Sequence, residues 1–508
     1  MRVIRTGSIL AALGLLCLSG SAVAAEALQD AGQNNKAVQA YNDGDYGTAV
    51  LLFADLADNA VSEEIRLRSE YYLAQSFFKM GLYDAALRQY SFVVKAGPNH
   101  PHYLRAIEGI VQVSEALRED FITGTVLDKE YNDEFAKLPI ETLNKINYIV
   151  GMVSYRKNKR DEAMSFFASV PPDSSYFARA RYMQGILFAR NGDFEKALES
   201  FGDVIKLSNT LKLTYFDLES IRHLAILGTA RTYYGMGRYA DAVKHYEQIP
   251  RFSEYWDEAL FENGWARFHN DDIGGALGSL QALHAPQFAG SFQPESWILK
   301  ATVYYSSCLY DDAKLALEGF EKIYLPISER LAALLEGDKD NDFYHALLDE
   351  KSTELPRSVK NYLVANKRLV QFKAYADQLD REKAIIRAEP AWKGSRIQGN
   401  LLGEIEQSKD LAVQLTGSFV KRRLDDAAKT IIGFDGQKEI IKFEVAKGET
   451  DMLERRLNQR THLAEQALYR PVMPGANWEY WQFQGEFWLD EIGYYQYTLK
   501  SGCMKREE

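Results

Sequence analysis

The sequence predicts an all-α protein: a solenoid of antiparallel helix pairs, followed by a long helical hairpin or coiled-coil-like region. Three regularities support this fold class. Alanine recurs at seven positions, a small residue stands twelve residues before each alanine, and a bulky apolar residue stands four after it. Successive alanines are 34 to 45 residues apart except for one double interval of 77, which predicts a degenerate unit near 102–135. The alanines are Ala49, Ala86, Ala163, Ala197, Ala242, Ala276 and Ala313.

Each regularity has a physical reason. Two helices cross closely only where both faces carry small side chains, and a bulky side chain one turn further on fills the space beside the crossing. The small residues are Ala37, Ala74, Gly151, Gly185, Ala230, Gly264 and Ala301. The bulky residues are Phe53, Tyr90, Phe167, Phe201, Tyr246, Leu280 and Leu317. Glycines at the expected turns, such as Gly44, Gly81 and Gly192, supply the backbone freedom that ends the first helix of a pair.

This period and pattern resemble a known family. A unit of about 34 residues with a small residue, an alanine and an aromatic residue is similar to the tetratricopeptide repeat, and Trp297 occupies the position of that repeat's opening tryptophan. The resemblance implies about eight units, one of them degenerate, over residues 25–325. It also implies that the first helix of each unit lines a concave groove.

Counting from the alanines assigns aromatic and cationic side chains to this groove. Such a groove suits an extended or helical peptide that carries acidic residues, because aromatic faces bury area with little entropy loss and arginine pairs with carboxylates. Many of these aromatic side chains are equally suited to packing between neighbouring repeats. The candidate groove residues are Tyr71, Phe78, Lys79, Tyr148, Tyr155, Arg156, Tyr182, Arg190, Tyr234, Phe261, Phe268 and Tyr305.

The first 24 residues predict a secretory signal peptide. Arg2 and Arg5 precede an apolar run at 9–18, and the small residues Ala-Val-Ala at 22–24 form a cleavage site. We therefore expect the mature chain to be exported. Lipidation at Cys17 is disfavoured, because leucine rather than a small residue precedes it. No later run approaches the ~18 uncharged apolar residues of a membrane span, so we expect no span in the mature chain.

Residues 326–470 predict two or three long amphipathic helices. Apolar side chains follow one another at helical spacing while charged residues lie outside the stripe. A hairpin of this kind caps the last repeat, which is the favoured interpretation, or presents a coiled-coil surface to a partner. The stripe contains Ile397, Leu401, Ile405, Ala412, Leu415 and Phe419.

Residues 471–508 form an aromatic-rich C-terminal segment. Helical spacing joins four apolar side chains on one face: Trp488, Ile492, Tyr495 and Leu499. This spacing predicts a terminal helix docked on the long hairpin, and the alternative is an exposed aromatic anchor for a partner. The aromatic patch is Trp478, Trp481, Phe483, Trp488 and Tyr495.

The string at 481–503, WQFQGEFWLDEIGYYQYTLKSGC, is similar to C-terminal segments of exported repeat proteins from deltaproteobacteria, including envelope components of myxobacterial gliding machinery. The resemblance implies a location in the periplasm or on the periplasmic face of the outer membrane. It also implies a role in a multiprotein envelope machine. The partners would be other envelope proteins, held through extended or helical peptide segments.

Composition and motifs argue against several other classes. The formal charge of −11 and a pI near 5.5 argue against nucleic-acid binding. The Gly-x-Gly string at 235–237 coincides with a repeat turn, and the acidic loop at 338–349 lacks the glycine and glutamate of a calcium loop. We expect no enzyme activity, cofactor or metal. The alternative is a peptidoglycan-binding or cell-wall-processing enzyme with a helical solenoid, for which Glu486 and Glu491 are weak candidates.

The cysteines Cys308 and Cys503 lie far apart in the sequence. They could pair in an oxidising compartment, but free or buried thiols are the favoured expectation.

Overall fold

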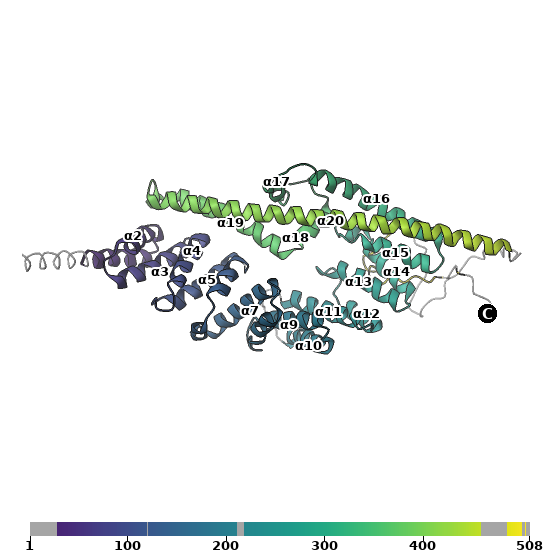
Figure 1. Cartoon of the computed structure of the whole chain (residues 1–508), viewed down its shortest axis with the longest axis horizontal. Coiled ribbons are helices and arrows are strands. Elements are labelled where there is room, and N and C mark those ends of the chain that lie inside the picture. Colours follow the sequence, from purple (N-terminus) through teal and green to yellow (C-terminus); the bar gives the residue numbers. More distant parts are fainter. Residues whose placement is uncertain (1–27, 119, 211–217, 459–484, 500–502, 504–508) are drawn as a thin grey trace, which may run out of the picture. The chain divides into compact units, whose positions relative to one another are not determined.

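The computed structural model describes residues 28–118, 120–210, 218–458, 485–499 and 503 (Figure 1). In these ranges the regular elements are helices and no strand occurs, which confirms the predicted all-α fold. The expected signal peptide, 1–24, lies outside the described residues, and so do Trp478, Trp481 and Phe483.

The described chain divides into two compact units. The first contains the described residues up to Tyr176 together with Val370–Leu415, and the second contains Phe177–Leu369 and the described residues from Thr416 onwards.

Helices follow one another in pairs within both units (Figure 1). In the first unit a helix at 28–42 precedes α2 (Tyr46–Asn59), and the next pairs are α3 (Glu63–Lys79) with α4 (Tyr83–Lys95), α5 (Tyr103–Leu117) with α6 (Ile122–Glu130), and α7 (Ile140–Arg156) with α8 (Arg160–Ala168). In the second unit the pairs are α9 (Phe177–Asn191) with α10 (Phe194–Thr210), α11 (Leu218–Gly235) with α12 (Tyr239–Tyr246), α13 (Trp256–His269) with α14 (Ile273–Leu283), and α15 (Glu295–Ser306) with α16 (Tyr310–Leu335). Short 3₁₀ turns are η1 (Asp133–Lys137) and η2 (Pro286–Phe288).

The crossing within the pairs that contain a repeat alanine follows the reasoning from sequence. All seven repeat alanines have no exposed surface. A methyl group on Gly151 would lie 2.7 Å from the ring of Phe167, and one on Gly185 would lie 2.5 Å from the ring of Phe201. The bulky residue of the second helix therefore occupies the notch left by the small residue of the first.

The turn between paired helices has one repeated backbone feature. The residue five positions before each repeat alanine has a positive φ, between 57° and 82°. This left-handed conformation is tolerated best by glycine and next by asparagine and aspartate. The residues are Gly44, Gly81, Asn158, Gly192, Gly237, Asp271 and Cys308.

After the repeats the chain forms α17 (Asn341–Ala346), α18 (Arg357–Val364), α19 (Lys367–Ala388), η3 (Pro390–Trp392) and α20 (Arg396–Asn458). The boundary expected at residue 325 lies inside α16, which continues through Pro326. A proline inside a helix removes one hydrogen bond, and the burial of Tyr324 and Leu331 on either side offsets that cost.

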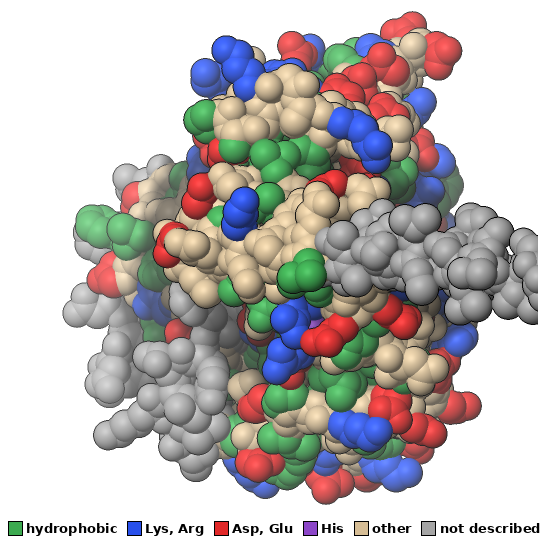
Figure 2. Space-filling view, turned by 90° about the vertical axis from the view of Figure 1, so that its left-hand side faces the viewer, with side chains coloured by type: hydrophobic (Ala, Val, Ile, Leu, Met, Phe, Trp, Pro, Cys, Tyr) green, Lys and Arg blue, Asp and Glu red, His purple; other side chains and the backbone are tan. Residues whose placement is uncertain are grey.

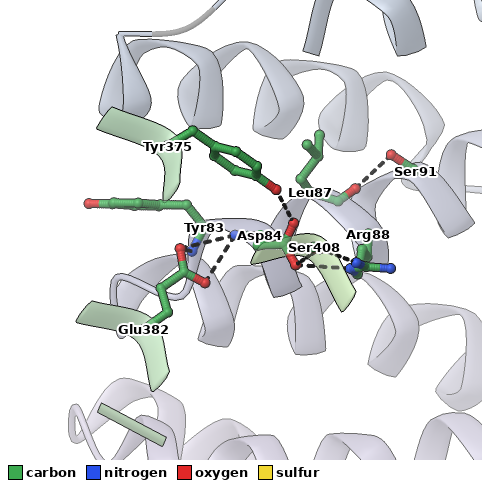
Figure 3. A network of polar contacts seen from close by, with 8 residues as sticks. All are labelled: Tyr83, Asp84, Leu87, Arg88, Ser91, Tyr375, Glu382 and Ser408. Atoms are coloured by element: carbon green, nitrogen blue, oxygen red, sulfur yellow. Dashed lines mark hydrogen bonds and ion pairs between the residues drawn. The ribbon is translucent and has the colours of Figure 1, made fainter. Parts of the chain in front are cut away.

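In the first unit, α19 and the beginning of α20 are joined to α4 by a buried polar network (Figure 3). The fully buried Glu382 accepts hydrogen bonds from the backbone N–H groups of Tyr83 at 2.9 Å and Asp84 at 3.2 Å. Asp84 in turn accepts hydrogen bonds from the hydroxyls of Tyr375 and Ser408. A carboxyl group at a helix N-terminus accepts hydrogen bonds from backbone donors that the helix leaves unpaired.

Burial is the main cause that raises the pKa of Glu382 to about 8, and the neighbouring Asp84 adds to it. A second anchor lies nearby, because Trp392 is fully buried and its ring N–H donates to the carbonyl of Gly47 at 2.9 Å. These long helices are therefore packed against the first repeats of their unit.

In the second unit, the later part of α20 packs on α15 and α16. Lys438 lies 2.9 Å from Glu321, and Lys314 lies 2.7 Å from Glu449. The buried face of this part is mainly apolar and includes Val420, Leu424 and Ile431, with the buried Lys438 as a charged member.

Candidate peptide-binding site

Three predicted groove aromatics pack inside their own repeats. In the first unit, the rings of Tyr71 and Tyr148 each lie 6.2 Å from the bulky aromatic ring of the paired helix, Tyr90 and Phe167 respectively. In the second unit, Tyr182 makes the same contact with the ring of Phe201, at 5.7 Å. The packing role that the sequence left open was between neighbouring repeats, and Tyr71 makes a contact of that kind as well, because its ring stacks on that of His102, just before α5, at 4.7 Å.

The predicted cations lie at the ends of first helices and are exposed. Lys79 ends α3 and Arg156 ends α7 in the first unit, and Arg190 lies near the end of α9 in the second. The half-buried Phe78 and Tyr155 precede two of them.

The remaining groove candidates belong to the second unit and are half-buried. The Tyr234 ring lies 5.3 Å from that of Tyr239, and Phe261 and Phe268 pack against the apolar core around α13 and α15. The hydroxyl of Tyr305 donates to Glu444 of α20 at 3.4 Å, so α20 covers this position.

The C-terminal segment differs from the sequence expectation. Residues 485–499 contain turns and extended chain instead of a helix, and they pack on the repeats instead of on the hairpin. Gly493 has a φ of 95°, which interrupts the helical spacing on which the expectation rested. The run Tyr-Tyr-Gln-Tyr-Thr that follows consists mainly of residues that favour extended chain. Trp488 of the predicted helix face is 53% exposed.

Two glycines of α14 receive the backbone of this segment. The N–H of Tyr497 donates to the carbonyl of Gly274 at 3.1 Å. A methyl group on Gly274 would lie 2.2 Å from the carbonyl oxygen of Tyr497, and one on Gly278 would lie 1.7 Å from that of Tyr495. Only a helix face without side chains allows an approach this close.

A second set of contacts fixes the preceding turn. The guanidinium of Arg251 donates to the carbonyls of Leu489 at 2.5 Å and Asp490 at 3.2 Å, and it lies 4.9 Å from the centre of the Tyr494 ring. Ile492 has no exposed surface and joins the apolar core that contains Trp256. The segment thus has one fully buried aliphatic anchor.

The extended part has the alternation of a strand. Tyr495, Tyr497 and Leu499 are partly buried, whereas the residues between them are exposed. The hydroxyls of Tyr497 and Tyr304 share a hydrogen bond, and burial raises the pKa of both phenols. Both groups are therefore neutral and can act as donor and acceptor.

A disulfide joins Cys503 to Cys308 at the turn between α15 and α16, with the two Cα atoms 5.0 Å apart. The expectation of free thiols was therefore wrong. It rested on the separation of 195 residues in sequence, but the docked segment brings the two cysteines together.

A cavity of about 370 Å³ lies beside the docked segment, between α12, α13, α14 and residues 493–496. Asn263, Arg267 and Ser279 are among its lining residues. Asn263 is only 6% exposed, and its Oδ1 has no hydrogen-bond partner within the described part of the chain. Buried polar groups are normally paired, so the side-chain carbonyl oxygen of Asn263 is an acceptor that lacks its donor.

The residues that hold the segment were missed at the sequence level. One usable signal was the start of α14, Ile-Gly-Gly-Ala-Leu-Gly, since each glycine inside a helix costs about 1 kcal/mol relative to alanine. Glycines at Gly274 and Gly278, one helical turn apart, indicate that another chain segment approaches closely.

The described residues were also compared with the requirements of a metal site, a membrane span and a basic surface. Within the described ranges, no three His, Cys, Asp or Glu side chains gather in a way that could hold a metal ion. No helix in the same ranges is both long and apolar enough to cross a membrane. On the face shown in Figure 2, acidic and basic side chains are interspersed, so that face presents no broad basic area.

These features define an α-solenoid of paired helices. Residues 179–208 and 224–251, which contain most of the pairs α9–α10 and α11–α12, match the family model of the tetratricopeptide repeat. These two stretches of the chain are therefore tetratricopeptide repeats.

Solved structures that are similar to this chain include the following three. A tetratricopeptide repeat protein from Parabacteroides merdae ATCC 43184 is 11% identical over 51% of this chain and 93% of its own, with a TM-score of 0.32. A Rap protein complexed with competence and sporulation factor is 11% identical over 76% of this chain and 99% of its own, with a TM-score of 0.28. Yeast Tom70 is 14% identical over 85% of this chain and 97% of its own, with a TM-score of 0.21. No curated protein sequence matches this chain.

Proposed function

We propose that this chain is an exported, non-catalytic scaffold that holds other proteins of the bacterial envelope by binding their extended segments on its repeats. The observation that carries the proposal is the docked C-terminal segment: α13 and α14 bind a turn, through one buried aliphatic side chain, and the extended stretch that follows it, through backbone contacts. A surface that binds one extended stretch in this way is chemically suited to bind others.

Two features support export as part of this proposal. The N-terminal residues have the pattern of a signal peptide. A disulfide between Cys308 and Cys503 is typical of oxidising compartments such as the bacterial periplasm and rare in the cytosol. The proposed location is the periplasm or the periplasmic face of the outer membrane, and the proposed setting is a multiprotein machine of the gliding-motility type.

Photo-crosslinking in cells tests the scaffold role. A photoreactive amino acid placed at Arg156 or Arg190, at exposed ends of first helices, should form adducts with other envelope proteins. The matched control is the same amino acid at Glu195, which is exposed on a second helix. Adducts confined to Glu195, or none at any position, would refute the groove as a binding surface. Recovery of the chain in the cytoplasmic fraction would refute export.

A further inference from the structure

The contacts that hold the C-terminal segment fall into two kinds. Backbone contacts to Gly274 and Gly278 involve the extended part of the segment, and those to Arg251 involve the carbonyl groups of the turn before it; both sets use main-chain atoms of the segment. Side-chain contacts are confined to a few positions, of which Ile492 is fully buried and Tyr497 reaches the hydroxyl of Tyr304. A different chain with the same few side chains, and with a glycine in the place of Gly493, could make all of them, because Gly493 has a φ of 95° and a methyl group on it would lie 2.9 Å from Trp256.

We propose that this surface of α12–α15 binds in trans a segment of another protein that makes a turn and then extends, with an aliphatic residue followed directly by glycine and, three and five residues after the aliphatic residue, by tyrosines. The chain's own residues 489–497 are its intramolecular substitute, retained by the Cys308–Cys503 disulfide. This inference rests on the proposed function and specifies the partner and the control of one site.

The docked segment leaves part of the site unused. The cavity of about 370 Å³ lies along its edge, and the buried amide of Asn263 at the cavity wall has an unpaired Oδ1 among the described residues. Three apolar side chains of the segment remain largely exposed: Trp488, Leu489 and Tyr494. A partner segment that fills the cavity and supplies a donor to Asn263 gains contacts that the chain's own segment does not make.

The disulfide favours the chain's own segment, because a tether raises its effective concentration at the site above that of any partner. Cys503 is exposed and Cys308 is partly exposed, so the bond can be reached from solvent. A dithiol reductant opens it: the S–S bond breaks, each cysteine sulfur gains a proton, and the dithiol closes to its own disulfide, so that two electrons are transferred. The segment is then held by non-covalent contacts alone and can be displaced.

The backbone conformation of Cys308 also indicates that a cysteine at this position has a structural role. Its φ of 57° is left-handed, and the six equivalent turn positions carry glycine, asparagine or aspartate. Cysteine is disfavoured in this conformation, so its presence here indicates that the disulfide is worth the backbone strain.

The test measures binding of a fluorescent peptide that copies residues 486–499 to the purified full chain by fluorescence anisotropy. Three proteins are compared: oxidised wild type, Cys503→Ser, and Cys503→Ser combined with Ile492→Asp. The last variant places a charge on the buried anchor of the tethered segment and leaves every repeat residue unchanged. We expect affinity to rise at least about tenfold from the first protein to the second, and again from the second to the third.

Matched peptides test the specificity. The peptide with Ile492→Asp should not bind, and the peptide with Tyr497→Phe should bind several-fold more weakly, because it lacks the hydroxyl that meets Tyr304. Equal binding of the peptide to oxidised wild type and to the double variant would overturn the proposal, since the tethered segment would not compete.

Absence of binding to every protein would also overturn it. Loss of hydrogen-exchange protection in α12–α14 of the double variant would mean that its repeats are perturbed, and the single variant Cys503→Ser then decides. If Cys503→Ser binds the peptide no more tightly than oxidised wild type does, the proposal is overturned. The scaffold role is judged separately, because crosslinks from Arg156 and Arg190 do not depend on this segment.

Discussion

The turn at Cys308 gives a sharp test of the repeat geometry. Cys308→Gly and Cys308→Ala both remove the disulfide, but only glycine is comfortable at a φ of 57°. We expect the glycine variant to hold the turn between α15 and α16 more firmly than the alanine variant. This is the reverse of their order in a helix interior, where alanine is the better residue.

The magnitude follows from two opposing effects. A left-handed conformation costs a residue with a side chain about 1–2 kcal/mol. In the opposite direction, glycine costs about 0.4–1 kcal/mol relative to alanine, because it loses more conformational freedom on folding. The net preference for glycine is therefore about 0.8 kcal/mol, which corresponds to about a fourfold difference in a local opening equilibrium.

The comparison has to be made between the two variants. The disulfide spans 195 residues, and loss of such a link costs about 5 kcal/mol in the chain-entropy description. That loss would hide the smaller effect in any comparison with the oxidised wild type. It cancels between Cys308→Gly and Cys308→Ala.

Hydrogen exchange measured by mass spectrometry on peptides covering residues 299–320 is the suitable assay. Exchange in the end of α15 and the start of α16 should be about fourfold slower in the glycine variant. Cys503→Ala, which keeps the cysteine at the turn, should exchange like Cys308→Ala. Equal or faster exchange in Cys308→Gly would show that the turn carries no left-handed strain.

Three further predictions concern other parts of the chain. Burial raises the pKa of Glu382 to about 8 from 4.5, so between these values the folded first unit keeps a proton that the unfolded chain loses. The free energy of unfolding of this unit should therefore fall as the pH rises from about 4.5 to 8. Urea titrations at several pH values should show this fall in the wild type and not in Glu382→Gln. Gly278→Ala should expel the C-terminal segment, because the new methyl group would lie 1.7 Å from the Tyr495 carbonyl oxygen, and chymotrypsin should then cut it faster; Gly433→Ala, with open space around it, should leave the cutting rate unchanged. Phe201→Ala should cost about 3–5 kcal/mol and lower the urea midpoint of the second unit, because the fully packed ring fills notches at two glycines.

The repeats were predictable because their determinants are local. Phe201 lies sixteen residues after Gly185, and the helix geometry of one pair is enough to bring the two together. The same argument works at Gly151, and the buried alanines follow from it. A periodic pattern repeated seven times specifies the local contacts without any knowledge of distant residues.

The C-terminal segment was not predictable in this way. Ile492 and Tyr495 satisfy a helical spacing, but Tyr495 and Tyr497 equally satisfy the alternation of an extended chain. What decides between them is the bare face of α14 around Gly274 and Gly278, more than 200 residues earlier in the sequence. Local spacing holds no information about a surface so distant.

The sequence contained a signal for the disulfide at Cys308 that the distance between the two cysteines did not reveal. Its position in the repeat register is set by Ala313, and five residues before an alanine the other units place glycine, asparagine or aspartate. Those residues share the ability to adopt a left-handed backbone, whereas cysteine does not. A cysteine at a position with this requirement is costly unless its sulfur gains a bond. With Cys503 as the other cysteine after the first 24 residues, the register itself favours a pair over two free thiols. A residue that departs from the type found at the equivalent position of the other repeats can therefore indicate a functional role.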